Sequence, residues 1–139
     1  REKVERYVEI GKAQGAELVT GGVRPRGSRL ANGYFYKPTV FTNVKAGSRL
    51  ALEEIFGPVL SVIKVGSYEE AVKVNNEVEY GLSSSIYTRD VNRAFRALED
   101  LQNGITYVNA PTIGAEAHLP FGGVKQTGNG HAVACHLRG

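Results

Sequence analysis

The sequence predicts an α/β fold with a parallel-type open sheet and covering helices, and three observations support this prediction. Residues 58–65, PVLSVIKV, carry apolar side chains at successive positions, which is typical of a strand covered by helices on both faces. Two further β-rich runs follow at 82–88 and 105–109. A segment with helical periodicity lies between each pair of runs, and the joints are short. This alternation indicates consecutive right-handed crossovers in a parallel sheet.

The first segment of the chain predicts an amphipathic surface helix. Residues 1–14 place Val4, Tyr7 and Val8 on one face at helical spacing. Gly15 is positioned to end this helix.

A less regular β region is expected after this helix. Residues 17–22 are a short apolar run ended by glycines, and residues 33–44 are rich in aromatic and β-branched side chains, with Pro38 indicating an edge or an interruption. The segment between the two runs contains three arginines, Arg24, Arg26 and Arg29. We interpret it as a solvated loop, with phosphate binding as the alternative.

Both central helices carry start signals. Ser67 with Glu70 three residues later is a capping box, and Gly81 is expected to end that helix. Asp90 is expected to cap the second helix, which closes at Asn103-Gly104. The apolar residues of the second helix form one stripe, made of Val91, Ala94, Phe95, Leu98 and Leu101.

Composition excludes several classes of protein. With 139 residues, 42% of them hydrophobic, the chain can bury the core of one domain without disulfides. Its single cysteine, Cys135, favours a cytoplasmic setting. No apolar run reaches the length of a membrane span and no signal-peptide pattern is present, so we expect no membrane partner. The net charge of +3 is scattered, so we expect no nucleic-acid partner, although a basic nucleic-acid binder stays a rival hypothesis.

The segment LEEIFGPVLSV, residues 52–62, sets two carboxylates and an aromatic ring before a Gly-Pro step. Taken alone, Glu53 and Glu54 are an exposed pair, since adjacent carboxylates resist being ionised together when they are desolvated. Pro58 has a fixed φ and restricts the residue before it, so this turn fixes where Glu54 and Phe56 point. That rigidity is suited to a binding site.

The C-terminal part of the chain offers weaker candidates. The glycine-rich run 121–130, FGGVKQTGNG, lacks the spacing of a phosphate-binding P-loop. Cys135 lies beside His136, near His131 and His118, but a nucleophile normally needs a base from another part of the fold, and a metal needs well-spaced ligands. We therefore expect no metal site and treat these residues as an ordinary tail.

Five motifs, in this order and at these separations, resemble the aldehyde dehydrogenase superfamily: GYFYKPTVF, EEIFGPVLSV, YGLSSSIYTRD, GITYVNAP and LPFGGVKQTGNG. The resemblance extends from residue 1 to about residue 130 and implies the C-terminal part of the catalytic domain, with 131–139 as a divergent tail. It implies NAD or NADP as cofactor and a small aldehyde as substrate.

The resemblance also implies roles for individual residues. Glu54 would hydrogen-bond the hydroxyls of the ribose beside the nicotinamide, and Phe56 would pack against the nicotinamide end. The aromatic ring of Phe121 would line the aldehyde tunnel with Leu119 and Pro120 beside it. The loop 110–119 would then shape substrate choice.

Part of the family pattern is missing from these residues. The nucleophilic cysteine, the general-base glutamate, the oxyanion-hole asparagine and the dinucleotide-binding fold precede the matching region in the family, and the chain has no methionine, as if its beginning lay elsewhere. We therefore expect no catalytic residue in this chain and no activity from the chain alone. The alternative is a non-catalytic fragment that associates with a complementary or full-length subunit, and a homo-oligomer is also expected.

Overall fold

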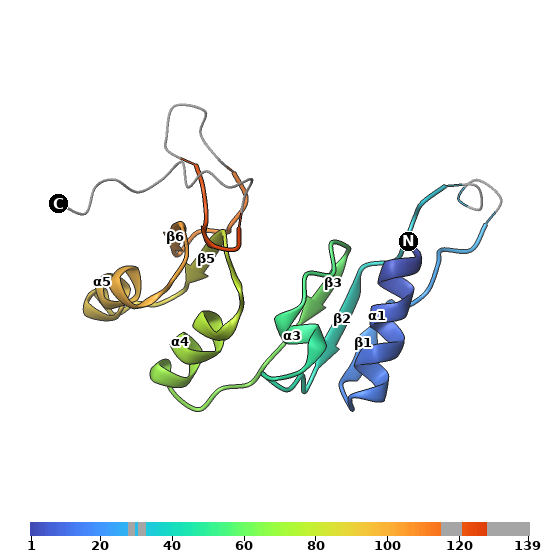
Figure 1. The fold of residues 1–139 in the computed structure, drawn as a ribbon, viewed down its shortest axis with the longest axis horizontal. Helices are drawn as coiled ribbons and strands as arrows, with labels where there is room; N and C mark the ends of the chain where they lie inside the picture. Colours follow the sequence, from blue (N-terminus) through green and yellow to red (C-terminus); the bar gives the residue numbers. More distant parts are fainter. Residues whose placement is uncertain (28–29, 31–32, 115–120, 128–139) are drawn as a thin grey trace. The chain divides into compact units, whose positions relative to one another are not determined.

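The computed structural model describes residues 1–27, 30, 33–114 and 121–127. The chain divides into two compact units, Arg1–Gly66 and Ser67–Gly139, which we call unit 1 and unit 2. Each unit combines helices with small sheets (Figure 1), so the predicted α/β class is confirmed.

Unit 1 places helices beside a three-stranded mixed sheet. Strand β2 is central: it pairs antiparallel with β1 and parallel with β3, with Val40 opposite Leu60. The elements follow in the order α1 (Glu2–Ala13), β1 (Glu17–Thr20), β2 (Thr39–Thr42), α3 (Arg49–Leu52) and β3 (Val59–Ser61). The first helix and the β region after it therefore form as the sequence predicts.

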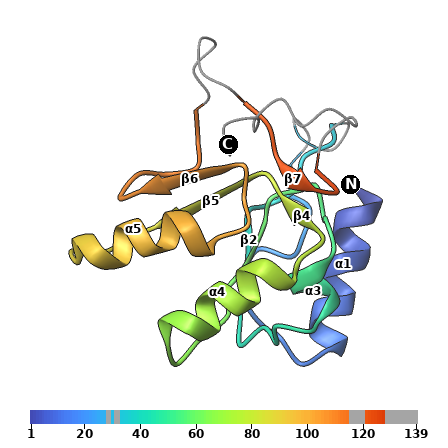
Figure 2. The ribbon, with the colours of Figure 1, turned by 60° about the vertical axis from the view of Figure 1, so that its left-hand side comes forward.

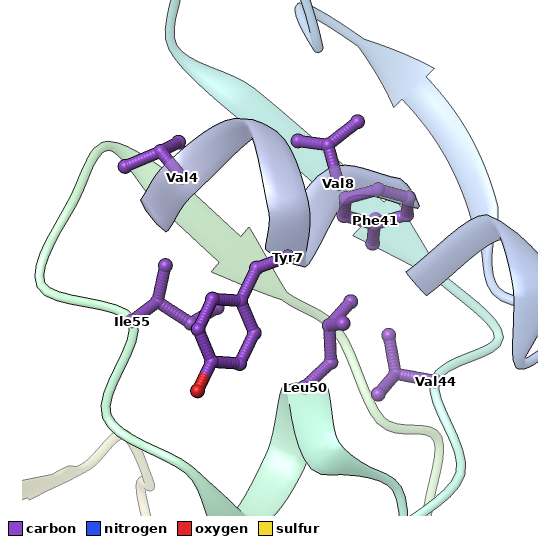
Figure 3. Close-up of a cluster of buried hydrophobic side chains, with 7 residues drawn as sticks. All are labelled: Val4, Tyr7, Val8, Phe41, Val44, Leu50 and Ile55. Atoms are coloured by element: carbon purple, nitrogen blue, oxygen red, sulfur yellow. The ribbon is translucent and has the colours of Figure 1, made fainter. Parts of the chain in front are cut away.

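One hydrophobic core holds unit 1 together (Figure 3). Helix α1 contributes the face predicted from its periodicity, and the remaining side chains come from β2, α3 and the loops that flank them. Gly11 allows α3 to approach α1 closely, because a Cβ built there would lie 2.7 Å from Cδ2 of Leu50. The buried hydrophobic residues are Val4, Tyr7, Val8, Phe41, Val44, Leu50 and Ile55.

Strand β3 is shorter and more exposed than the apolar run suggested. Val59 and Ile63 pack against the core, whereas Leu60 and Val62 are 59% and 43% exposed. Successive side chains of a strand point to opposite faces, and within unit 1 only one of the two sets meets the core. The expectation of a strand covered on both faces is therefore wrong for unit 1.

Unit 2 is built around a parallel pair, β5 and β6, joined by helix α5 (Figure 2). The register runs from Ser83 opposite Ile105 to Ile86 opposite Val108. A short antiparallel pair, β4 with β7, lies in the same unit. The elements are α4 (Tyr68–Glu77), β4 (Tyr80–Gly81), β5 (Ser83–Ile86), α5 (Val91–Asp100), β6 (Ile105–Val108) and β7 (Val124–Lys125).

The predicted series of three neighbouring strands is confirmed only in its second half. The crossover from β5 through α5 to parallel β6 is present. Strand β3, in contrast, pairs with β2 in unit 1 rather than with β5. Pairing is decided by contacts between distant segments, which the local pattern of the apolar run does not contain.

Helix α4 ends at Glu77, before the predicted stop at Gly81. The chain turns to extended structure at Val78, and a lysine side chain binds the carbonyls at this helix end. Nζ of Lys125 donates to the carbonyl oxygens of Asn76 at 2.7 Å and of Val78 at 3.0 Å. Gly81 lies in β4 instead, opposite Val124.

The described helices include none with the length and apolar character needed to cross a bilayer.

Candidate functional site

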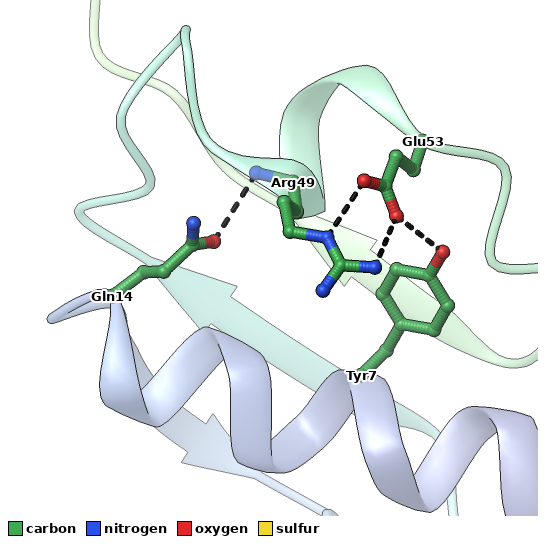
Figure 4. A network of polar contacts seen from close by, with 4 residues as sticks. All are labelled: Tyr7, Gln14, Arg49 and Glu53. Atoms are coloured by element: carbon green, nitrogen blue, oxygen red, sulfur yellow. Dashed lines mark hydrogen bonds and ion pairs between the residues drawn. The ribbon is translucent and has the colours of Figure 1, made fainter.

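The segment that joins α3 to β3 is anchored first by Glu53 (Figure 4). Its carboxylate accepts hydrogen bonds from Nε and Nη2 of Arg49, at 2.6 and 2.9 Å, and from the hydroxyl of Tyr7 at 2.5 Å. The Arg49 guanidinium, followed by the Tyr7 hydroxyl, lowers the pKa of Glu53 to about 2. The same carboxylate raises the pKa of Tyr7. Glu53 is thus charged at neutral pH and acts as a structural partner.

The next anchors alternate with exposed positions. Ile55 is buried in the unit 1 core. Gly57 sits against α1, since a Cβ built there would lie 2.4 Å from Cγ2 of Val4. The carbonyl oxygen of Pro58 accepts a hydrogen bond from the amide of Thr39 at 2.8 Å. The backbone is therefore fixed before and after each of the two exposed positions, 54 and 56.

Those two residues are Glu54 and Phe56, and both are exposed. The Phe56 ring is 85% exposed, and its backbone has φ of 56°, a left-handed conformation that is uncommon for a bulky residue and costs about 1 kcal/mol or more. Glu54 is exposed too, and within the described residues no hydrogen bond or ion pair involves its carboxylate. An anchored loop thus presents a free acid and a free aromatic ring.

This pair has the chemistry that a nicotinamide nucleotide requires. A carboxylate has two acceptor oxygens and can take hydrogen bonds from both hydroxyls of a ribose. An exposed aromatic ring offers an apolar surface for a nicotinamide. Because Arg49 and Tyr7 occupy the neighbouring Glu53 carboxylate, Glu54 alone has its oxygens available. The residues present therefore fit the group that the resemblance implied.

In unit 2 the structure describes one of the three expected substrate-pocket residues. Phe121 is 48% exposed and precedes β7, whereas Leu119 and Pro120 lie outside the described residues. The backbone after Phe121 is packed tightly, because a Cβ built at Gly104 would lie 1.9 Å from the carbonyl oxygen of Gly122. The hydroxyl of Thr127 also accepts a hydrogen bond from the Gly81 amide at 2.7 Å.

A shallow hollow lies at the carboxyl ends of β5 and β6, lined by Tyr87, Thr88, Arg89 and Asn109. The side-chain amide of Asn109 makes two hydrogen bonds with the backbone of Thr88. Oδ1 of Asn109 accepts from the N–H of Thr88, and Nδ2 of Asn109 donates to the carbonyl oxygen of Thr88, both at 2.9 Å. This edge of a parallel sheet is where ligands collect in α/β folds. Asn109, which also has a left-handed φ of 53°, clamps the two strand ends together.

Two residues that hold the following loop were not foreseen from the sequence. The hydroxyl of Ser85 donates to the carbonyl oxygen of Ala110, and that of Tyr107 donates to the carbonyl oxygen of Gly114, both at 2.6 Å. Their only sequence signal is a hydroxyl near the end of each parallel strand. These bonds attach the start of the expected substrate loop to the sheet.

The remaining candidates from the sequence are the basic loop and the histidines and cysteine near the C-terminus. Arg24 forms an ion pair with Glu5, which raises the pKa of Arg24, so this arginine of the basic loop already has an acidic partner. His118, His131, Cys135 and His136 lie outside the described residues.

The comparisons with known proteins decide the family. The model of the aldehyde dehydrogenase family matches residues 1–136. The chain belongs to this family. The α-ketoglutarate semialdehyde dehydrogenase of Haloferax volcanii is 46% identical over 121 residues, covering 87% of this chain and 25% of that protein. The betaine aldehyde dehydrogenase of Bacillus subtilis is 42% identical over 135 residues, covering 96% of the chain and 27% of that protein.

A solved aldehyde dehydrogenase structure matches the fold as well. The betaine aldehyde dehydrogenase from Staphylococcus aureus in complex with NAD⁺ has a TM-score of 0.85 at 36% identity, covering 90% of this chain and 25% of that one. The chain therefore spans about a quarter of the length of the aldehyde dehydrogenases that it matches.

Proposed function

We propose that this chain is the C-terminal part of the catalytic domain of an NAD(P)-dependent aldehyde dehydrogenase, which oxidises an aldehyde to a carboxylic acid. The family match over residues 1–136 and the NAD⁺ complex of the Staphylococcus aureus relative support this proposal. Residues 1–130 would form the catalytic-domain segment and residues 131–139 the divergent tail. The single cysteine supports a cytoplasmic setting.

The single observation that carries the proposal is the free carboxylate of Glu54 on an anchored loop. We assign Glu54 to the hydroxyls of the nicotinamide ribose and Phe56 to the nicotinamide end of the cofactor. The anchors at Glu53, Ile55 and Gly57 mean that little ordering is needed when the cofactor binds, so the interaction is preorganised.

We assign the substrate side to unit 2. Phe121, with Leu119 and Pro120, would line the aldehyde pocket, and the loop 110–119 would select the aldehyde. The hydrogen bonds of Ser85 and Tyr107 support this role because they fix the backbone from which the loop starts.

The cofactor, when bound, would accept the hydride from the adduct of the aldehyde with a catalytic cysteine, and loss of this hydride would leave a thioester. The residues of this chain would orient the nicotinamide and the aldehyde, and no nucleophile is assigned among them. Cys135 follows the glycine-rich run and matches no nucleophile motif. Residues 1–139 alone are therefore proposed to be inactive.

A chimaeric enzyme tests the assignment of Glu54. This chain would replace the matching quarter of the Bacillus subtilis betaine aldehyde dehydrogenase, and NADH formation would be followed with betaine aldehyde. We expect Glu54→Gln to raise the KM for NAD⁺ about tenfold or more, since a charge-assisted hydrogen bond contributes about 1.5–3 kcal/mol.

The matched control is Glu2→Gln, which removes another exposed carboxylate of unit 1. It should leave the KM for NAD⁺ unchanged. The same KM for NAD⁺ in the Glu54→Gln chimaera and the unsubstituted chimaera would refute the ribose assignment.

A further inference from the structure

Helix α5 has three large apolar side chains that are exposed. Val91, Phe95 and Leu98 are 63%, 66% and 44% exposed, and their spacing of four and three residues puts them on one stripe of the helix. We call these three residues the α5 stripe. Single exposed apolar residues are ordinary, whereas a row of three large ones on one helix is a candidate interaction surface.

The other apolar residues of this segment are buried or partly buried within the folded chain. Ala97 is fully buried, Ala94 is partly buried, and Leu101, which directly follows the helix, is partly buried as well. On a helical projection they lie directly beside the α5 stripe, so the apolar arc is continuous and roughly 160° wide. Within unit 2, the described residues cover the part of this arc formed by Ala94, Ala97 and Leu101 and leave the α5 stripe open.

The sheet beside α5 is also open. Strands β5 and β6 form a two-stranded parallel sheet, and neither has another strand partner among the described residues. Parallel sheets occur almost only where further strands and helices cover them, because their edges and faces are not suited to water. The α5 stripe and these open edges belong to the same β5–α5–β6 crossover. Figure 2 shows the course of this crossover.

We propose that the α5 stripe is the docking surface for the part of an aldehyde dehydrogenase polypeptide that lies outside residues 1–139. This inference rests on the proposed function, because it takes the chain to be one segment of a catalytic domain. The relatives are about four times as long as the length that they share with this chain. That additional polypeptide is the occupant, and it would present an apolar helix or sheet face to the stripe.

The polar side of α5 is bound within unit 2, which leaves the α5 stripe as the side available to a partner. Arg96 forms ion pairs with Glu69 at 3.3 Å and with Asp100 at 3.2 Å, and Asp100 accepts a hydrogen bond from the hydroxyl of Tyr68 at 2.9 Å. These contacts tie the polar face of α5 to α4 within unit 2. The α5 stripe is thereby held outward on a fixed helix.

Co-purification of two separate polypeptides tests the proposal. Tagged residues 1–139 would be co-expressed with the portion of the Bacillus subtilis betaine aldehyde dehydrogenase that precedes its match, and the captured amount of that companion measured. We expect Phe95→Asp to reduce capture at least about tenfold, because a central aromatic residue dominates an interface of this kind. The control Arg93→Ala changes an exposed residue on the opposite side of the same helix and should leave capture unchanged. Cofactor is absent from this assay, so its result is independent of the role of Glu54.

A thiol-labelling arm keeps the test decisive if a variant is poorly folded. Phe95→Cys in a Cys135→Ser background places the sole thiol of the chain on the stripe. We expect rapid reaction with a maleimide in the dilute chain alone and at least about tenfold slower reaction when the companion is bound. The matched Arg93→Cys variant, on the opposite side of the helix, should stay reactive in both states. Far-UV circular dichroism confirms that each variant is folded.

Four results would overturn the proposal. The first is equal capture by the unsubstituted and Phe95→Asp chains, and the second is failure of the unsubstituted chain to capture the companion. The third is a concentration-dependent dimer that Phe95→Asp abolishes, which would make a second copy the occupant. The fourth is a thiol at position 95 that is protected in the dilute chain alone, which would mean that another part of this chain covers the stripe.

Discussion

Two adjacent carboxylates, Glu53 and Glu54, have different environments and therefore different uses. Glu53 is bound by Arg49 and Tyr7, and this holds its pKa at about 2. Glu54 has no such partner among the described residues. One acid of the pair fixes the loop, and the other is left available on the surface. The doublet by itself does not reveal this division, because it depends on Arg49, four residues earlier, and on Tyr7, 46 positions earlier in the chain.

The pKa of Glu53 predicts a specific loss of stability in acid. Its folded value of about 2 lies below the ordinary value of 4.5, so the carboxylate binds protons more weakly in the folded chain. Its contribution is complete above pH 4.5 and is lost as the pH falls toward 2. We expect Glu53→Gln to lower the urea midpoint at pH 7 and to reduce the steepness of its fall between pH 4.5 and 2.

Urea titrations followed by circular dichroism at several pH values measure this effect. The control is Glu54→Gln, which should leave both the midpoint at pH 7 and its dependence on pH close to those of the unsubstituted chain. A Glu53→Gln chain with an unaltered acid profile would show that the ion pair does not stabilise the fold.

At the scale of single elements, the sequence correctly predicted the N-terminal caps of helices α4 and α5. The Ser67 hydroxyl accepts from the Glu70 amide at 3.1 Å, and Asp90 accepts from the amides of Asn92 and Arg93 at 2.9 and 3.2 Å, as the two capping patterns predicted. The end of α4 could not be predicted this way, because its carbonyls are bound by Lys125, 47 to 49 residues away. The two N-terminal caps are local, whereas the end of α4 involves a tertiary contact.

The cap of α5 leads to a quantitative prediction. Asp90→Ala removes the acceptor of two amide hydrogen bonds and should lower the free energy of unfolding by about 1 kcal/mol. Urea unfolding of the whole chain measures it. Asp90→Ser, which retains a capping oxygen, should recover most of the loss, and a variant Asp90→Ala as stable as the unsubstituted chain would contradict the role of the cap.

At the scale of the whole molecule, the family was predictable because five motifs keep their order and separation, and the family match confirms it. The geometry of the candidate site was only partly predictable. The Gly-Pro step indicated a rigid turn, but the left-handed backbone of Phe56 and the packing of Gly57 on Val4 depend on α1 lying beneath the loop. The open stripe of α5 was likewise hidden, since the amphipathic pattern does not state which apolar residues the chain itself covers.

The distribution of buried side chains predicts unequal protection of the two units. Among the described residues, unit 1 has a cluster of seven buried hydrophobic residues, whereas Ala97 is the buried hydrophobic residue of unit 2. Fully burying one large apolar side chain contributes about 1.5–3 kcal/mol, and about 1.4 kcal/mol changes an equilibrium tenfold. After correction for intrinsic rates, we expect backbone amides of α5 to exchange hydrogen at least about tenfold faster than those of α1. Hydrogen exchange with mass spectrometry on residues 1–139 measures both helices in one sample. Equal protection would mean that unit 2 is stabilised by something other than the apolar burial seen within it.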